Sequence, residues 1–95
     1  MRIFDKVTID ADGRVTLGPK FIPDGTTAVV FVVEDEMIAV YDANTIDFGV
    51  VSKVDQVHRV VIPKWLRHEL GDNTELYCTE MDGKFYLSKK TGYII

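Results

Sequence analysis

The stretch Asp55-Gln-Val-His-Arg-Val-Val-Ile-Pro-Lys64 decides the fold, because a related stretch, Asp10-Ala-Asp-Gly-Arg-Val-Thr-Leu17, precedes it in the chain. Each stretch places an arginine four residues after an aspartate and continues with apolar residues. Arg59 follows Arg14 by 45 residues. Self-similarity at a fixed spacing is the signature of repeated structural units. We therefore interpret the chain as a tandem of two related units.

The similarity extends beyond these two stretches. A Pro-Lys pair follows Ile62 in one stretch and comes after Leu17 in the other, as Pro63-Lys64 and Pro19-Lys20. A second match, between Asp35–Val40 and Asp82–Leu87, has a spacing of 47 residues. One domain over residues 1–95 is therefore predicted, made of a diverged unit, 1–47, and a second unit, 48–95.

The expected order in the second unit is strand, strand, helix, strand, strand. Pro63 suits the first turn of a helix, where its missing N–H is no loss. Gly71 stands where a helix end favours glycine, and Asp82-Gly83 is a strong hairpin signal. The predicted elements are strands over 48–54, 59–62, 74–80 and 84–88 and a helix over 64–70.

The first unit differs in its middle. Pro19 and Pro23 leave little room for a helix, so a turn or loop is expected there. The apolar run Ala28–Val33 predicts a strand that is buried on both faces. This unit is therefore expected to be mainly structural.

Composition places the chain among compact globular domains, with 46 % hydrophobic and 27 % charged residues. No apolar run reaches the ~20 residues needed to cross a bilayer, and Met1–Lys6 lacks the apolar core of a secretion signal. A cytoplasmic protein without a membrane partner is expected. Cys78, the one cysteine, allows no internal disulfide and is expected to be buried.

The charge is unevenly divided between the units. The net charge is −4, but residues 1–47 hold four basic and nine acidic residues, whereas 48–95 hold seven basic and six acidic residues. The excess of cations is concentrated in the segment 53–68. Such asymmetry indicates a local binding face inside an acidic protein.

The predicted nucleic-acid-binding residues belong to this basic segment. Guanidinium groups suit phosphate oxygens and the acceptor edge of guanine, and lysine adds attraction to the phosphate backbone. On a helix, residues three and four apart share a face, which predicts outward-facing cations opposite Leu66 and Leu70. The candidate residues are Lys53, His58, Arg59, Lys64, Arg67 and His68.

Structural roles are the alternative for several of these side chains. An outward cationic helix face is often only solvated, and Arg59 is also a possible structural partner of Asp55. Trp65, on the flank of the helix, is expected to pack in the core or an interface rather than against bases.

The segment Val50–Gly71 resembles the DNA-binding domain of the AbrB and SpoVT transition-state regulators, through the pattern D-x-x-x-R-V-V-I-P-K-x-(I/L)-R. The match continues through Glu75-Leu-Tyr and Gly83–Lys90. In that family a swapped hairpin pairs with a second copy into an interlaced β-barrel and places arginines of its loop and short helix on DNA. The resemblance implicates Arg59 and Arg67, and also His68 and Lys53.

Two departures qualify this resemblance, and the first is that the unit 1–47 keeps the D-x-x-x-R spacing but lacks the helix and its cations. His58 stands where the family commonly has glycine, which is expected to alter the turn. Two units in one chain are similar in architecture to the MraZ proteins. The expected fold is mainly β with a short helix, in which tandem β-β-α-β-β swapped-hairpin units form an AbrB-like interlaced barrel.

The predicted function is that of a transcriptional regulator that binds double-stranded DNA through the basic loop and helix of the second unit. Symmetric DNA reading would require a homodimer or a higher oligomer. An antitoxin or protein-interaction module of the MazE type is the alternative. Such antitoxins usually have a flexible C-terminal segment, whereas here only five residues follow Lys90.

An enzyme is not expected. The sequence has no G-x-S-x-G motif, no phosphate-binding P-loop and no paired Cys/His arrangement. The two histidines have no neighbouring cysteine or paired acidic ligands, so neither a metal site nor a cofactor is predicted.

Overall fold

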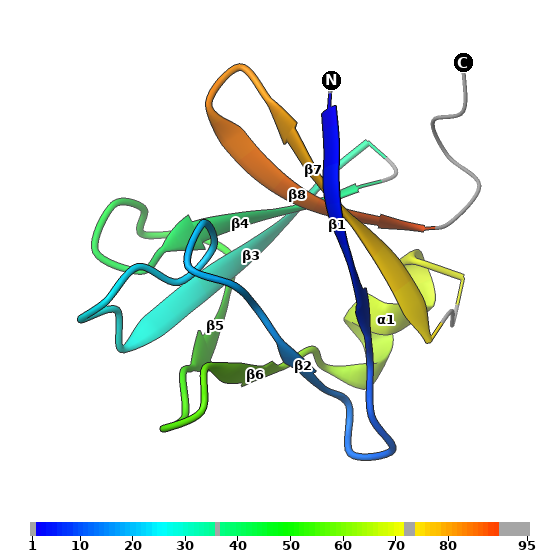
Figure 1. Cartoon of the computed structure of the whole chain (residues 1–95), viewed down its shortest axis with the longest axis horizontal. Coiled ribbons are helices and arrows are strands. Elements are labelled where there is room, and N and C mark those ends of the chain that lie inside the picture. Colours follow the sequence, from blue (N-terminus) through cyan, green and yellow to red (C-terminus); the bar gives the residue numbers. More distant parts are fainter. Residues whose placement is uncertain (1, 36, 72–73, 90–95) are drawn as a thin grey trace.

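The computed structural model describes residues 2–35, 37–71 and 74–89, and this part of the chain is mainly β with one short helix (Figure 1). The predicted match at Lys90 and the chain end at Tyr93–Ile95 lie outside the described residues. The elements are β1 (Arg2–Thr8), β2 (Arg14–Thr16), β3 (Ala28–Glu34), β4 (Met37–Asp42), β5 (Val50–Lys53), β6 (Arg59–Val61), α1 (Lys64–Glu69), β7 (Glu75–Met81) and β8 (Lys84–Lys89).

The strands form a six-stranded antiparallel sheet in the order β1-β7-β8-β4-β3-β5 and a separate two-stranded ribbon, β2-β6. The order of the large sheet is symmetric: exchange of β1 with β5, β3 with β7 and β4 with β8 gives the same order read from the opposite edge. Four pairings, β1 with β7, β3 with β5, β4 with β8 and β2 with β6, join the first half of the chain to the second. Within the described residues β1 and β5 do not pair with each other, so the sheet is open and no closed barrel is formed.

Local turn chemistry explains the hairpin β7-β8. Asp82 and Gly83 both have positive φ angles, 54° and 78°, between the paired residues Met81 and Lys84. A two-residue turn of this kind matches the right-handed twist of the flanking strands. The hairpin predicted from Asp82-Gly83 is thereby confirmed.

The predicted elements of the second unit have slightly different bounds in the structure. The strand predicted over 48–54 is shorter, because Gly49 has a φ of 113° and Phe48 is 61 % exposed. The helix predicted over 64–70 ends at Glu69, with Leu70 as its C-cap. In the first half a turn replaces the helix, as predicted, and the backbone N–H groups of Phe21 and Ile22 donate to the Gly18 carbonyl.

The main core lies between the large sheet, the β2-β6 ribbon and α1. Phe31, Ile38, Leu66, Leu76 and Leu87 are among its almost fully buried side chains. The prediction that the third strand is buried on both faces holds for Val29–Phe31 only, because Val33 is 41 % exposed.

Cys78 is buried in this core, as predicted. Burial raises the pKa of its thiol to about 12, and the negative charge of Asp5 contributes to the same shift.

Candidate nucleic-acid interface

The loops before β2 and β6 have the same hydrogen-bonding pattern, as the repeated D-x-x-x-R motif predicts. In the first, Oδ1 of Asp10 accepts the backbone N–H groups of Asp12 and Arg14, both at 2.9 Å. In the second, Oδ1 of Asp55 accepts those of Val57, at 2.9 Å, and Arg59, at 2.8 Å. The aspartate therefore fixes the loop backbone just before the arginine in both units.

The backbone conformation of the two loops also agrees. Gly13 has a φ of 79°, and His58, at the corresponding place, has a φ of 61°. The expectation that His58 alters the turn is therefore wrong. Histidine is one of the residues that adopt this left-handed conformation more often than most.

Hydrogen bonds across the ribbon relate the two loops to each other. The carbonyl of Gly13 accepts the N–H of Ile62 at 2.9 Å, and the carbonyl of His58 accepts the N–H of Leu17 at 3.0 Å. Each loop is thus hydrogen-bonded to the residue that directly follows the ribbon strand of the other half, Ile62 after β6 and Leu17 after β2. The two loops lie at opposite ends of the β2-β6 ribbon (Figure 1).

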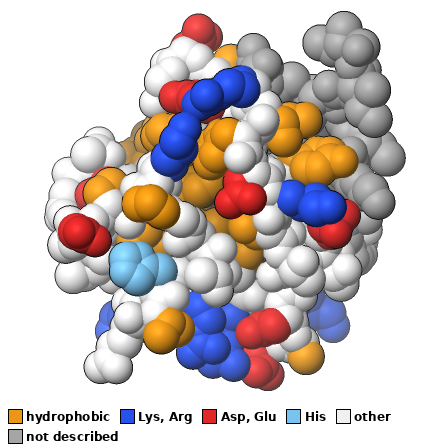
Figure 2. Space-filling model, in the orientation of Figure 1, with side chains coloured by type: hydrophobic (Ala, Val, Ile, Leu, Met, Phe, Trp, Pro, Cys, Tyr) orange, Lys and Arg blue, Asp and Glu red, His pale blue; other side chains and the backbone are white. Residues whose placement is uncertain are grey.

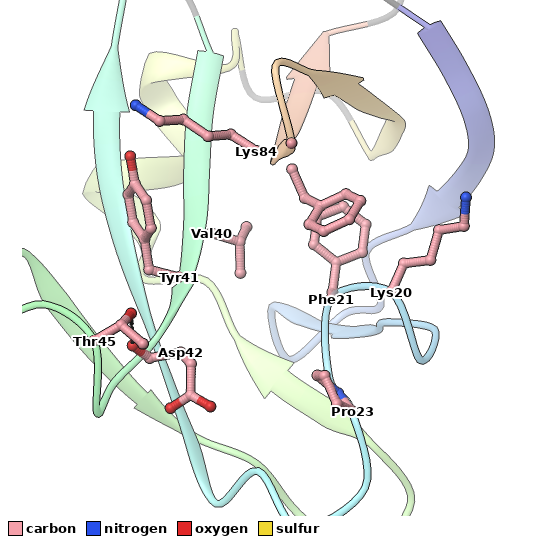
Figure 3. Close-up of a pocket in the computed structure, with 10 residues that line it drawn as sticks. Lys20, Phe21, Pro23, Val40, Tyr41, Asp42, Thr45 and Lys84 are labelled. Carbon is pink, nitrogen blue, oxygen red and sulfur yellow. Dashed lines mark hydrogen bonds between the residues drawn. The ribbon is translucent and has the colours of Figure 1, made fainter.

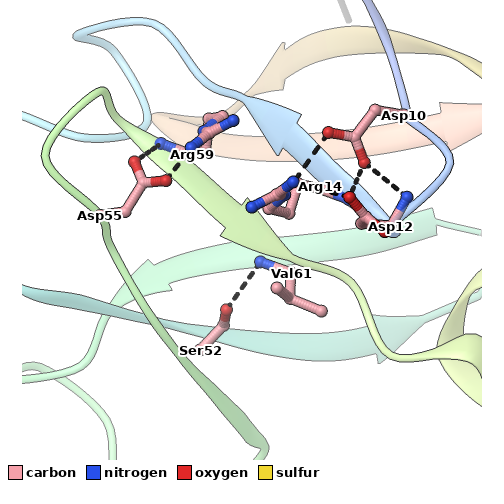
Figure 4. A network of polar contacts seen from close by, with 7 residues as sticks. All are labelled: Asp10, Asp12, Arg14, Ser52, Asp55, Arg59 and Val61. Atoms are coloured by element: carbon pink, nitrogen blue, oxygen red, sulfur yellow. Dashed lines mark hydrogen bonds and ion pairs between the residues drawn. The ribbon is translucent and has the colours of Figure 1, made fainter.

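Arg14 and Arg59 share the outer face of the ribbon. Arg14 pairs with Val61, and Thr16 pairs with Arg59. Paired residues of antiparallel strands project to the same side, whereas the intervening Val15 and Val60 are each only 1 % exposed and face the core. The two arginines are therefore diagonal neighbours on the surface (Figure 4).

The ribbon is fastened to the large sheet at β5, because the Ser52 hydroxyl accepts the backbone N–H of Val61 at 3.1 Å. This bond ties the outer face that carries the two arginines to a rigid element.

The surroundings of the two guanidinium groups differ. Nε of Arg59 lies 2.8 Å from Oδ2 of Asp55, so the structural pairing considered from the sequence is confirmed. Arg14 contacts two carboxylates, with Nη2 2.7 Å from Oδ2 of Asp12 and Nε 3.5 Å from Oδ2 of Asp10. In the part of the chain that the structure describes, Asp55 is the only carboxylate paired with Arg59.

The loop aspartates are held in their charged form. The backbone N–H of Arg14 lowers the pKa of Asp10, and the N–H of Asp12 and the charge of Arg14 lower it further, against a smaller opposing effect of desolvation. The backbone N–H of Arg59 lowers the pKa of Asp55 in the same way, with the N–H of Val57 and the Arg59 side chain adding to the shift.

The six predicted site residues fall into two groups. Lys53, at the end of β5, lies with His58 and Arg59 at the end of the ribbon formed by loop 55–59. Lys64, Arg67 and His68 lie on α1, which begins beside loop 10–14. Figure 2 shows Lys and Arg side chains beside acidic ones at the side of the molecule that carries the ribbon in Figure 1.

Arg67 does not project outward with Lys64 and His68, and this prediction was wrong. Its guanidinium lies against Gly13, where an added Cβ would approach Arg67 Cζ to 3.0 Å. Leu66 is the buried residue of this six-residue helix, and Arg67 follows it directly in the chain. The Arg67 side chain is therefore half-buried. The Nε of Arg67 is buried with no hydrogen-bond partner among the described residues.

Trp65 lies outside the core, one of the two places predicted for it. The indole is 59 % exposed, and it lines a surface hollow with Lys64, His68 and Glu69. Leu66 and Leu70 occupy the buried side of α1, and Trp65 lies on the other side of this helix.

Arg14 is the candidate that the charge distribution concealed. The acidic composition of residues 1–47 assigned it a structural role, but the ribbon brings it onto the same surface as Arg59. The repeat alignment, which matches Arg14 with Arg59, was the signal that could have found it.

A cavity of about 240 Å³ lies between the turn 18–23 and the β7-β8 hairpin (Figure 3). Phe21, Phe85 and Val40 give it an apolar wall, and Lys20 and Lys84 lie at its margin. The Lys20 ammonium is engaged elsewhere, because its Nζ lies 4.7 Å from the centre of the Phe4 ring.

Within residues 2–35, 37–71 and 74–89 no group of three or more His, Cys, Asp or Glu side chains could hold a metal ion. The described chain also has no helix that is both long and apolar enough to span a membrane.

No family model matches this chain, and no curated protein matches its sequence. What the interface can do therefore has to follow from its geometry. It offers two fixed arginines on the outer face of a narrow antiparallel ribbon, with further cations at both ends.

Proposed function

We propose that this protein is a DNA-binding transcriptional regulator that uses the outer face of the β2-β6 ribbon. The observation that carries the proposal is the placement of Arg59, held by an aspartate-anchored loop, on the outer face of the ribbon with exposed cations near it. A preorganised guanidinium loses less conformational freedom when it binds a phosphate or a guanine edge.

The shape of the ribbon supports duplex DNA as the partner. The major groove, about 12 Å wide, admits a two-stranded β-ribbon. The cations at the two ends of the ribbon would face the flanking phosphates, which position a protein on DNA without reading sequence. Lys53, His58 and Lys64, all exposed, supply this contact together with Arg59.

The finer fold that we propose is the interlaced barrel of the AbrB and SpoVT regulators, with both units in one chain as in the MraZ proteins. It is supported by the exchange of strands between the halves and by the matching loops. A tandem supplies the second hairpin at high effective concentration. A cytoplasmic location, and a homodimer on palindromic operators, belong to the same proposal.

Fluorescence anisotropy with two labelled duplexes, the region upstream of its own coding sequence and a scrambled version, tests the function. Binding should weaken steeply with salt, because each neutralised phosphate contributes ~0.9 to the logarithmic salt slope. Arg59→Ala should cost about 1–3 kcal/mol of binding free energy on the upstream duplex.

The matched control is Lys84→Ala, which removes one positive charge at the β7-β8 turn, far from the ribbon (Figure 1). This variant should bind almost as the unchanged protein does. Equal affinities of the Arg59→Ala and unchanged proteins, with equal melting temperatures, would remove Arg59 from the interface. Failure to bind either duplex at low salt would remove DNA as the partner.

A protein-interaction module, including an antitoxin, is the second candidate, and the exposed indole of Trp65 favours it. Tryptophan is enriched at the energetic centres of protein interfaces. Trp65→Ala separates the two functions, because it should abolish binding to a protein partner while leaving the contacts of Arg59 with DNA in place.

A further inference from the structure

The two loops that carry Arg14 and Arg59 differ at the position two residues before each arginine. Asp12 in the first loop corresponds to Val57 in the second, since their backbone N–H groups donate to the equivalent aspartate oxygens, Oδ1 of Asp10 and of Asp55. Both side chains are exposed, Asp12 at 73 % and Val57 at 57 %. Neither is needed for the core, so the difference concerns the surface.

Asp12 changes the charge that the first loop presents. Its Oδ2 lies 2.7 Å from Nη2 of Arg14, the outer edge of the guanidinium, whereas Asp10 approaches the Nε side. Arg59 is paired only at Nε, among the described residues. Its two terminal nitrogens therefore remain directed away from a carboxylate, while one of those of Arg14 is occupied.

The neighbouring cations make this difference larger. Arg67 lies against Gly13 in the same loop, so Arg14 and Arg67 would form a strongly basic end of the ribbon without Asp12. A carboxylate on this surface repels phosphates and also competes for the Arg14 guanidinium.

On the basis of the proposed DNA-binding function, we propose that Asp12 keeps Arg14 off the DNA phosphates and so confines the arginine contact with DNA to the loop 55–59. The loop 55–59 then dominates recognition, and each chain reads one half-site in one orientation. Rejection of the wrong contact by a like charge is a common way to obtain specificity.

Exchange of the two residues tests this inference in the full chain. Asp12→Val gives the first loop the residue of the second, and should raise affinity for both the upstream and the scrambled duplex about five- to tenfold at low salt. The logarithmic salt slope should increase by ~0.9, the value for one more phosphate contact. The converse exchange, Val57→Asp, should weaken binding by a similar factor.

A double-mutant cycle identifies Arg14 as the group that is released. Arg14→Ala should change binding by less than about twofold in the unchanged protein, but should remove most of the affinity that Asp12→Val gains. Asp12→Asn, which retains the amide oxygen as an acceptor for Arg14, should show part of the gain. Thermal melting of each variant controls for a loosened loop.

The outcomes separate this inference from the function on which it rests. Unchanged affinity and salt slope in Asp12→Val, in a protein that binds the upstream duplex and is weakened by Arg59→Ala, would overturn the role of Asp12 alone. Independent, additive effects of Asp12→Val and Arg14→Ala would overturn it as well. Absence of binding by every variant to both duplexes at low salt would overturn the proposed function together with the role of Asp12.

Discussion

At the scale of single residues, the backbone conformation of a few positions decides whether the halves fit together. Gly49, just before β5, has a φ of 113°, and a Cβ there would lie 2.5 Å from Val30 Cγ1 and 2.8 Å from the Phe31 carbonyl oxygen. The backbone oxygen cannot rotate away as a side chain could. The close approach of β5 to β3 therefore depends on the missing side chain.

Gly49→Ala should lower the free energy of unfolding by about 2–3 kcal/mol, because strained backbone and a steric clash coincide. Gly18→Ala is the matched control, since a Cβ there meets no atom within 4 Å. Urea unfolding of both variants checks the expectation. A stability of Gly49→Ala equal to that of Gly18→Ala would show that β5 does not approach β3 so closely in solution.

Burial of single side chains could be predicted from the sequence only in part. The predicted burial of Cys78 is confirmed, because a small apolar side chain in an alternating strand has few other places to go. Trp65 does not pack in the core, and its packing in an interface stays a prediction; its exposure depends on which side of a short helix faces the core, and Leu66 and Leu70 determine that side.

At the scale of elements, the two aspartate-anchored loops are local structures that the sequence determines almost alone. Their hydrogen bonds join residues at most four apart. The pattern D-x-x-x-R therefore predicts both the loop and the aspartate–arginine pair. The position of each loop relative to α1, by contrast, depends on pairing between β2 and β6.

Acid should loosen these loops. The pKa values of Asp10 and Asp55 are lowered in the folded protein, so their contribution to stability is present above the ordinary aspartate pKa of ~3.9. It is lost as the pH falls through the lowered folded values. The urea midpoint should therefore decrease below about pH 4 in the unchanged protein.

Asp55→Asn should flatten this dependence, because asparagine accepts the same backbone N–H groups without titrating. Asp24→Asn, at an exposed turn residue, serves as the control and should leave the dependence almost unchanged. Urea midpoints between pH 6 and pH 2.5 test the expectation. Parallel curves for the unchanged and Asp55→Asn proteins would contradict a stabilising role of this carboxylate.

At the scale of the whole molecule, the strands of the two halves are exchanged. β1 pairs with β7, β3 with β5, β4 with β8 and β2 with β6, so a cut between β4 and β5 removes the partner of several strands. Unpaired strands cannot satisfy their backbone groups except with water or another chain. Neither half has a complete core.

The separate fragments 1–47 and 48–95 should therefore be unfolded or self-associated, and should regain the native circular dichroism when mixed. Size-exclusion chromatography gives the state of each fragment, and the mixture should elute as a one-to-one complex. A monomeric fragment 1–47 with native-like circular dichroism would show that the units fold independently.

The sequence by itself determined the local features: the repeated loops, the Asp82-Gly83 hairpin, the position of the helix after Pro63 and a buried cysteine. These depend on residues close in sequence, where φ preferences and short hydrogen bonds decide. Strand pairing between the halves, the exposed Trp65, the contact of Arg67 with Gly13 and the shared surface of Arg14 and Arg59 were decided only by the tertiary structure. They join residues far apart in the chain, and the free energy that selects them comes from burying a common core, which no local pattern of residues contains.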